Sequence, residues 1–334
     1  MLDRPTMLRA GAAILGVAIV SLLFIGSYAG ALHDPQPHEI PIAVTAQVPA
    51  ELAQRLDASG AFAVRPARDR AGALSQIAHR DAYGAIVARA DGSIELVTAP
   101  AAGPAVAAAL TGGVLPELAR AGVKATTTVT HDLPHADARG LVGFYTAVGW
   151  VVAGYLGATF LGITFGTKPG RVHTAWRLAG LGVLALLVGI AGAALAAAIG
   201  DLGGSVLALG LVGALTIATV GAVTIALQST LGIAGTGLAV LLFVVAGNPS
   251  SGGPFPVELL PEPWRTIGPL IPTGAATTLL RDVAYFPSAS VAGPLLVLFA
   301  WLVAGVAVAM LLGHRRGPLT DAEAEAAIAG AMAP

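Results

Sequence analysis

The chain has 334 residues, of which 55% are hydrophobic and only 11% charged, and its formal net charge is -1. Soluble domains carry about 25% charged residues, so this composition excludes an ordinary soluble protein and predicts a protein of the membrane. The net charge excludes a broad basic surface for nucleic acid, and the absence of cysteine excludes disulfides and thiolate metal sites.

The first apolar stretch, Ala10–Leu32, is long enough to cross a bilayer, which requires about 20 apolar residues. Ala29-Gly30-Ala31 resembles a signal-peptidase site, so a cleaved signal peptide is the alternative. The uncharged run exceeds the roughly 15 residues of a signal-peptide core. We therefore expect a retained helix and assign residues 1–33 to an N-terminal transmembrane anchor.

Residues 34–139 have a water-compatible composition and are predicted to form a small extracytoplasmic α/β domain, because short β-type runs alternate with amphipathic helical patterns. The predicted strands are Ile40–Gln47, Ala61–Arg65, Tyr83–Arg89, Ile94–Thr98 and Val123–Thr130. The predicted helices are Pro49–Ala58, Asp69–His79 and Pro104–Ala121. The third and fourth strands flank a turn that contains Asp91-Gly92, which predicts a hairpin.

Four histidines lie at the two ends of this domain, namely His33, His38, His131 and His135. The last two have the i, i+4 spacing that binds a metal from one face of a helix. Pro134 between them disfavours a regular helix. We therefore expect solvated histidines and assign no metal ligand, with a metal-binding or pH-sensing site as the alternative.

Five further apolar stretches are predicted to form a transmembrane domain over residues 140–313. They are Leu141–Phe165, Trp176–Ile199, Ser205–Leu227, the short Leu231–Gly247, and Val291–Leu312. The predicted fold is therefore a polytopic α-helical membrane protein with six transmembrane helices. The α/β domain is inserted between the first two.

Lysine and arginine in short loops mark the cytoplasmic side of a membrane protein. Here they are Arg4, Arg9, Lys168, Arg171, Arg177, Arg315 and Arg316. Both termini, including a tail at 314–334, are therefore predicted to be cytoplasmic, and residues 34–139 and 248–290 lie outside. The abundance of arginine over lysine is typical of a GC-rich, bacterial genome, so we expect the bacterial plasma membrane.

Small residues recur at four-residue intervals in three of the spans. Examples are Gly162-x3-Gly166, Gly189-x3-Ala193-x3-Ala197 and Gly210-x3-Ala214. Such faces let helices approach closely in lipid, where hydrophobicity no longer drives their association. We interpret them as contacts within one bundle, with a dimer interface as the alternative.

The segment 248–290 is too rich in turn residues to be a simple connector, and Glu262–Ile267 and Thr273–Tyr285 are predicted to be short helices within it. Irregular backbone near membrane depth survives only where protein or water covers it. We therefore predict that this external segment caps an outward-facing cavity. The candidate residues of the cap are Asn248, Gly252, Trp264, Arg265, Arg281 and Asp282.

The metalloprotease motif His-Glu-x-x-His, the hydrolase motif Gly-x-Ser-x-Gly and the ATP-binding P-loop are all absent, so we expect neither an enzyme nor a bound cofactor. We also expect no charged group at mid-membrane depth. Thr216, Thr219 and Gln228 are the candidates for lining a translocation path. Threonine in lipid most often bonds back to its own helix, and Gln228 fits a helix cap or interface equally well.

Motifs in the external segment carry a resemblance to a known family. They are Asn-Pro-Ser-Ser-Gly-Gly (Asn248–Gly253), Leu-Pro-x-x-Trp-Arg-x-Ile-Gly-Pro (Leu260–Pro269) and Leu-Arg-Asp (Leu280–Asp282). With one anchor, an α/β ectodomain and a five-span block, the chain resembles the ABC-2-type permease superfamily. Within it, the chain is most similar to the YhgE/Pip-like and DUF3533-like membrane proteins. The resemblance implies the membrane half of an exporter, usually a dimer powered by a separate ATPase subunit.

The chain departs from that superfamily because only residues 1–9 and 166–175 are available for coupling to an ATPase. Two hypotheses follow. The first is an ABC-2-like permease subunit in the lipid bilayer, as a homodimer or with a related permease, that exports a hydrophobic or amphipathic substrate with energy from an ATPase. The second is a non-transporting envelope receptor or scaffold whose ectodomain binds a wall component, a phage or a partner protein.

Overall fold

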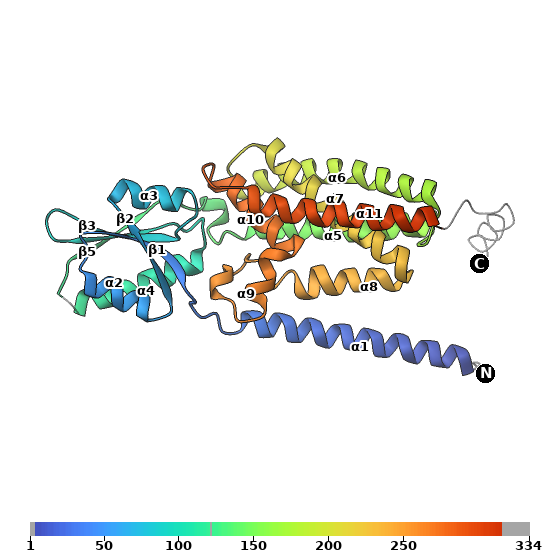
Figure 1. Ribbon diagram of the computed structural model, residues 1–334, viewed down its shortest axis with the longest axis horizontal. Coiled ribbons are helices and arrows are strands. Elements are labelled where there is room, and N and C mark those ends of the chain that lie inside the picture. Colours follow the sequence, from blue (N-terminus) through green and yellow to red (C-terminus); the bar gives the residue numbers. More distant parts are fainter. Residues whose placement is uncertain (1–3, 121, 316–334) are drawn as a thin grey trace.

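The computed structural model describes residues 4–120 and 122–315, which form an α/β domain and a helical domain placed end to end (Figure 1). Helix α1 (Arg4–Leu32) runs beside the helical domain and leads directly into the α/β domain. The two domains meet at one junction. Most of the predicted tail, residues 316–334, lies outside the described residues, as do residues 1–3.

The α/β domain is built on one mixed sheet of five strands in the order β2-β1-β3-β4-β5. The strands are β1 (Ile40–Thr45), β2 (Phe62–Ala67), β3 (Gly84–Ala88), β4 (Ile94–Thr98) and β5 (Ala125–Val129). β1 pairs in parallel with β2 and β3, β3 and β4 form the predicted antiparallel hairpin, and β5 runs parallel to β4. Each predicted strand is therefore present, with slightly shifted ends.

Helices cover both faces of the sheet: α2 (Ala50–Ala58) and α4 (Pro104–Arg120) lie on one face and α3 (Arg70–Ala78) on the other (Figure 1). Alternation along the strands explains this arrangement, because successive side chains point to opposite faces. Bulky Ile42 and Ile86 pack under α2 and α4, whereas Ala43 and Ala85 pack in the cluster that contains α3. Each face thus has its own core.

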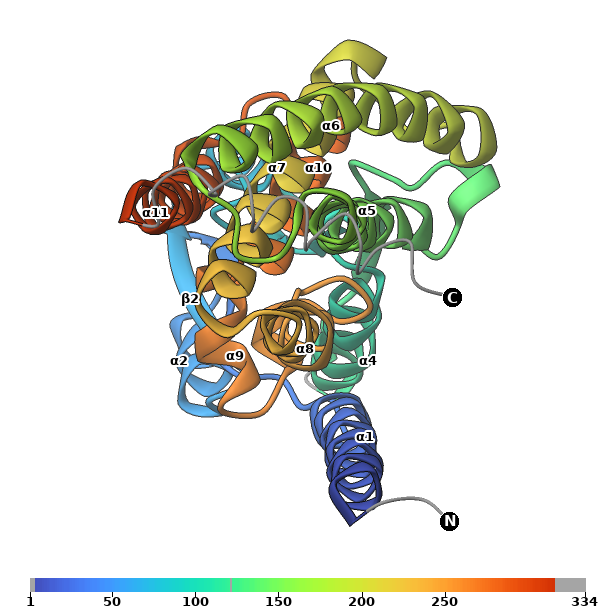
Figure 2. The same ribbon diagram turned by 90° about the vertical axis from the view of Figure 1, so that its right-hand side faces the viewer.

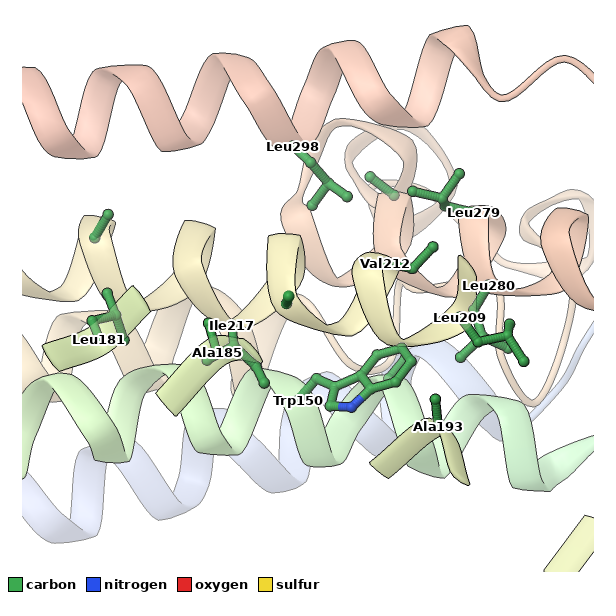
Figure 3. Close-up of a cluster of buried hydrophobic side chains, with 14 of the residues drawn as sticks. Trp150, Leu181, Ala185, Ala193, Leu209, Val212, Ile217, Leu279, Leu280 and Leu298 are labelled. Carbon is green, nitrogen blue, oxygen red and sulfur yellow. The ribbon is translucent and has the colours of Figure 1, made fainter. Parts of the chain in front are cut away.

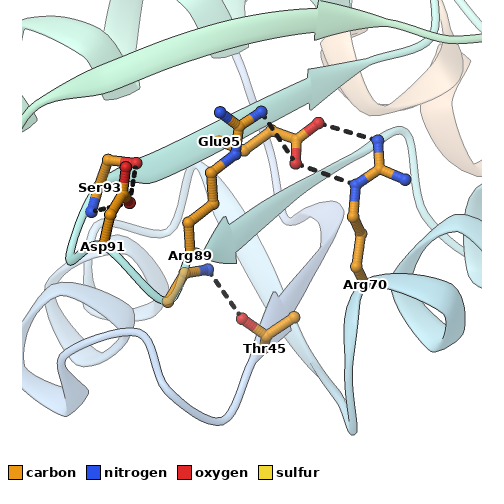
Figure 4. A network of polar contacts seen from close by, with 7 residues as sticks. Thr45, Arg70, Arg89, Asp91, Ser93 and Glu95 are labelled. Carbon is orange, nitrogen blue, oxygen red and sulfur yellow. Dashed lines mark hydrogen bonds and ion pairs between the residues drawn. The ribbon is translucent and has the colours of Figure 1, made fainter.

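A buried carboxylate ties α3 to the sheet (Figure 4). Glu95 on β4, 2% exposed, accepts two hydrogen bonds of 2.9 Å from the guanidinium of Arg70, and Arg89 lies 3.4 Å away. The hydrogen bonds from Arg70, followed by the charges of both arginines, lower the pKa of Glu95 to about 2. Glu95 therefore stays ionised in the folded domain at neutral pH.

Acid is expected to weaken the α/β domain through Glu95. Its folded-state pKa is depressed, so its contribution is present above the ordinary value of 4.5 and is lost as the pH falls toward 2. Because Arg70 is half exposed, we expect Glu95→Gln to cost only about 2 kcal/mol at neutral pH. Hydrogen–deuterium exchange of β3–β4 peptides, corrected for intrinsic exchange rates, measures this. An equal acid response in wild type and Glu95→Gln would contradict the assignment.

Within the described residues, five helices are long and apolar enough to cross a membrane, which indicates a membrane location for the chain. They are Ile14–Leu32 of α1, α5 (Leu141–Phe165), α6 (Arg171–Gly200), α7 (Val206–Leu231), and Ala292–Gly313 of α11 (Ala292–Arg315). Helix α7 lies between α5, α6 and α11, whereas α1 stands apart from this bundle (Figure 2).

The sixth predicted span is not among these long helices. Gly232, with φ +66°, ends α7, and the chain re-forms as α8 (Ala234–Val240), which the π-helical segment η2 (Leu241–Ala246) continues. The seven residues of α8 and the six of η2 together have a helical rise of only about 20 Å, whereas the hydrocarbon core of a bilayer is about 30 Å thick. Composition alone suggested a span over Leu231–Gly247, because the stretch is apolar throughout, but its ordered helix is too short.

Small residues bring the bundle helices into close contact around a core that includes Trp150, Leu181 and Ile217 (Figure 3). A Cβ atom added to Gly189 on α6 would lie 2.5 Å from the backbone nitrogen of Ala214 and 2.6 Å from the carbonyl oxygen of Gly210 on α7. The predicted small-residue faces of α6 and α7 therefore meet each other within one chain.

Gly189→Ala is expected to destabilise the bundle by about 1–2 kcal/mol, because backbone on the neighbouring helix occupies the space for the new methyl group. Gly182 on the same helix has no atom within 4 Å of its added Cβ, so Gly182→Ala is the matched control. We expect that control to leave the melting temperature unchanged or raise it, since alanine favours helix. Equal melting temperatures for the two variants in detergent would refute this packing.

Candidate functional site

The external segment begins with a turn that lies inside the helical domain. Helix η2 ends at Ala246, and the following Asn248, Ser250 and Ser251 are all buried. Ser250 Oγ donates to the carbonyl oxygen of Ala246 at 2.8 Å, and Ser251 Oγ donates to that of Asn248 at 2.7 Å. The hydroxyls therefore satisfy backbone carbonyls that the end of the helix leaves free, as buried irregular backbone requires.

Helix α10 (Pro272–Tyr285) starts beside the place where η2 ends. Thr273 Oγ1 donates to the carbonyl oxygen of Phe243 at 3.1 Å, and Gly247 packs so closely there that its Cβ would lie 2.6 Å from Thr273 Oγ1. From this point α10 runs outward to Phe286, whose ring stacks on His131 of the α/β domain at 4.8 Å. We call α8, η2 and α10 the interrupted helix; residues 247–271, which include the short helix Trp264–Ile267, separate its two halves in the sequence.

The outer end of α10 joins the two domains through a buried ion pair. Arg80, which follows α3 with φ +61°, places its Nη1 2.5 Å from Asp282 Oδ1, and these side chains are 15% and 4% exposed. The Arg80 guanidinium also lies 5.6 Å from the centre of the Phe286 ring. A single residue of the α/β domain therefore holds α10 by both charge and ring contact.

A second contact across the junction involves the loop that returns to α10. Tyr83 Oη donates to Glu258 Oε2 at 2.7 Å, and burial, reinforced by the charge of Glu258, raises the pKa of Tyr83. Tyr83 therefore remains a neutral donor at physiological pH. Arg281 Nη2 donates to the carbonyl oxygen of Gly252 at 3.0 Å, where φ of +73° suits glycine.

These contacts surround a cavity of about 460 Å³ between the domains. Its lining includes the basic residues Arg65, Arg80 and Arg281 and the acidic residues Asp81, Glu258 and Asp282. Charges of both signs thus face one space at the outer end of the helical domain. Such a lining suits the polar part of an amphipathic molecule better than an apolar one.

The predicted cap residues fall into distinct places. Gly252, Arg281 and Asp282 lie together at the junction, as described above. Trp264, in the short helix α9 (Trp264–Ile267), donates from its indole Nε1 to Ser27 Oγ of α1 at 3.0 Å. Arg265 pairs with nearby Glu262 at 2.9 Å on the surface. The predicted cap residues therefore form one group at the junction and another, with Trp264, that contacts α1.

Asn248 belongs with the cap residues that contact α1, because its side chain interacts with that of Tyr28 on α1. The Trp264 ring covers the next turn of α1 so closely that a Cβ on Gly30 would lie 2.8 Å from it. Helix α1 is thus fastened to the external segment at two points, although it stands apart from the bundle.

The three path-lining candidates are all buried in the bundle. Thr216 Oγ1 donates to the carbonyl oxygen of Val212 on its own helix at 2.8 Å, whereas Thr219 Oγ1 donates across to that of Leu298 on α11 at 3.2 Å. Each hydroxyl therefore has a structural partner in this state. Thr216 follows the usual behaviour of threonine in lipid, and Thr219 links two helices.

Gln228 pairs with a charged residue that the sequence analysis assigned to the cytoplasmic loops. Arg177 is completely buried, and its Nη2 donates to Gln228 Oε1 and, at 3.1 Å, to the carbonyl oxygen of Ala158. Its Nη1 donates to the carbonyl oxygen of Gly166 at 3.2 Å. Arg177 therefore lies inside the bundle near the first turns of α6, not exposed to solvent like an ordinary loop residue. The signal was a glutamine and an arginine at the same end of adjacent spans.

The histidines are not gathered into a site. His131 stacks on Phe286, His33 Nδ1 lies 2.8 Å from the carbonyl oxygen of its own helix at Ala29, and His135 opens the short helix η1 (His135–Asp137). Within residues 4–120 and 122–315, no three His, Cys, Asp or Glu side chains are grouped so that they could hold a metal ion.

Comparisons with known proteins add no assignment to this geometry. No family model matches the chain, and neither the curated proteins nor the solved structures gave a significant match.

Proposed function

We propose that this chain is the membrane subunit of an ABC-2-like export permease that moves a hydrophobic or amphipathic substrate. The observation that carries the proposal is the interrupted helix, whose two halves meet inside the helical domain at Ser250, Ser251 and Thr273. Interrupted helices place backbone groups and polar side chains at membrane depth, where carriers bind their substrates. A receptor or scaffold has no need of such a break.

The interrupted helix also completes the proposed topology. Helix α8 starts beside the loop that contains Lys168, and α10 ends against the α/β domain, so the two halves together cross in place of one continuous span. Their combined rise is about 40 Å, enough for the hydrocarbon core. With six crossings, both termini would lie in the cytoplasm of a bacterium and the α/β domain outside, and the basic residues of the short loops support this orientation.

Energy would come from a separate ATPase. Two copies of this chain, or one copy with a related permease, would form the working unit in the membrane. The loop between α5 and α6 is the described loop best suited to receive a motor. Arg177 anchors this loop through the carbonyl oxygen of Gly166 and connects it to Gln228 on α7. A movement of this loop would therefore be transmitted through Arg177 to α7, the central helix of the bundle.

The test is affinity purification of the tagged, full-length chain from its native membrane, followed by mass spectrometry of the proteins that accompany it. A nucleotide-hydrolysing protein in fixed proportion supports the permease. Its reproducible absence from folded chain, beside an untagged control, would overturn the proposal in favour of the receptor or scaffold.

A further inference from the structure

A second cavity, of about 430 Å³, lies within the α/β domain between α2 and α4. It is separate from the junction, because its lining comes from these two helices and the adjoining strands. Most of its walls are aliphatic or aromatic, and they include Leu52, Leu56, Phe62, Ile94, Leu118 and Val123. Its volume falls in the range of about 300–1,000 Å³ typical of small-molecule sites.

The polar groups around this cavity already have partners. Glu51 and Arg55 pair with each other at 3.6 Å, and Glu117 pairs with Arg120. Ser59 Oγ donates to the carbonyl oxygen of Leu56 at 2.5 Å and accepts from the backbone of the next segment. A ligand here would therefore be held by apolar contact rather than by hydrogen bonds.

Helix α4 borders the cavity with residues that lack a bulky side chain. Gly112, Gly113 and Pro116 lie inside this helix, and glycine and proline are the least favourable residues there. A Cβ on Gly113 would lie 3.7 Å from the Phe62 ring, so a larger side chain would extend over that ring into the cavity. Gly112, by contrast, has open space around its added Cβ. The residue at 113 thus sets the room available to a ligand.

We propose that this cavity binds an aliphatic chain, either that of a fatty acid or an acyl chain of a lipid. The apolar part of its walls consists mostly of branched aliphatic side chains, and its polar rim is paired and needs no partner from the ligand. Because α1 and the bundle are apolar enough to anchor the protein in a bilayer, fatty acids and lipid acyl chains are available close to this domain. This inference goes beyond the proposed function and holds whether or not the chain transports anything.

Photo-crosslinking of the full-length chain in lipid nanodiscs tests the inference. The probe is palmitic acid that carries a diazirine and an alkyne, and labelled peptides are mapped by mass spectrometry. We expect labelling of residues 49–62 and 113–123 that excess unmodified palmitate removes. A phosphatidylcholine with the diazirine in its acyl chain, used in a parallel sample, distinguishes a membrane lipid from a free fatty acid.

Two neighbouring substitutions supply the matched comparison. Gly113→Leu should reduce labelling of the cavity by about tenfold, equivalent to ~1.4 kcal/mol, whereas Gly112→Leu should leave it unchanged. Labelling of the membrane helices serves as the internal standard for both. Cavity labelling of the wild-type chain that is absent with both probes, or that the matching unmodified lipid fails to remove, overturns the inference. Equal labelling of the Gly113→Leu and Gly112→Leu chains overturns it as well.

Discussion

Asp282→Ala is expected to be the most damaging single change at the junction, with a loss of about 3–5 kcal/mol of stability. The substitution leaves the guanidinium of Arg80 buried without its ion-pair partner, and a buried unpaired charge costs far more than the pair itself contributes. Thermal unfolding of the purified chain in detergent measures the loss. Asp132→Ala, at an exposed carboxylate of the α/β domain, is the control and should have little effect.

The double variant Arg80→Met with Asp282→Ala separates the ion pair from other effects. Because both charges are then removed, we expect it to be more stable than Asp282→Ala alone. A double variant that loses the sum of the two single losses would show that the two residues act independently. That outcome would contradict the junction described above.

Trp264→Ala is expected to release α1 from the external segment, at a cost of about 3 kcal/mol. The indole fills the space above Gly30 and bonds Ser27, so its loss removes one of the two points at which α1 is held. Trp176→Ala is the matched control, since Trp176 is 61% exposed. Thermal unfolding of both variants gives the size of the effect.

The position of α1 can be followed separately, because the natural chain contains no cysteine. Cysteines that replace Tyr28 and Asn248, whose side chains interact, should be joined in native membranes by a thiol-reactive bifunctional reagent about as long as a tyrosine side chain. We expect Trp264→Ala to lower the yield of that cross-link and Trp176→Ala to leave it unchanged. An unchanged yield in both would mean that Trp264 does not position α1.

Local patterns predicted the parts of this fold that depend on near neighbours in the sequence. The alternation around Ile42 and Ile86 gave the strands, and Asp91-Gly92 marked the hairpin. The small residues at Gly189 and Gly210 predicted close helix packing, which the contact between α6 and α7 confirms. In each case the decisive interaction lies within one element or between adjacent helices.

The rest depended on contacts that sequence spacing does not reveal. Arg80 and Asp282 are 202 positions apart, so only the folded arrangement pairs them, and the sequence pattern indicated Asp282 without its partner. Arg177 resembled a loop residue because basic residues near helix ends usually mark the cytoplasmic side. Arg177 is buried because α6 begins before it, at Arg171, and because Gln228 on the neighbouring α7 accepts a hydrogen bond from its guanidinium. Likewise, the apolar stretch before Asn248 did not disclose that its helix ends at Ala246, inside the helical domain.

The most direct test of the proposed permease asks whether the break in the interrupted helix can be reached by water during activity. Single cysteines would replace Ser251, Thr273, exposed Ser288 and lipid-facing Leu187, and native membranes would receive a small water-soluble thiol reagent with and without ATP. We expect modification of the cysteines at positions 251 and 273 to increase when ATP is added. The cysteine at 288 should be modified with and without ATP, and the cysteine at 187 should not be modified under either condition. Modification at 288 alone would contradict the proposal.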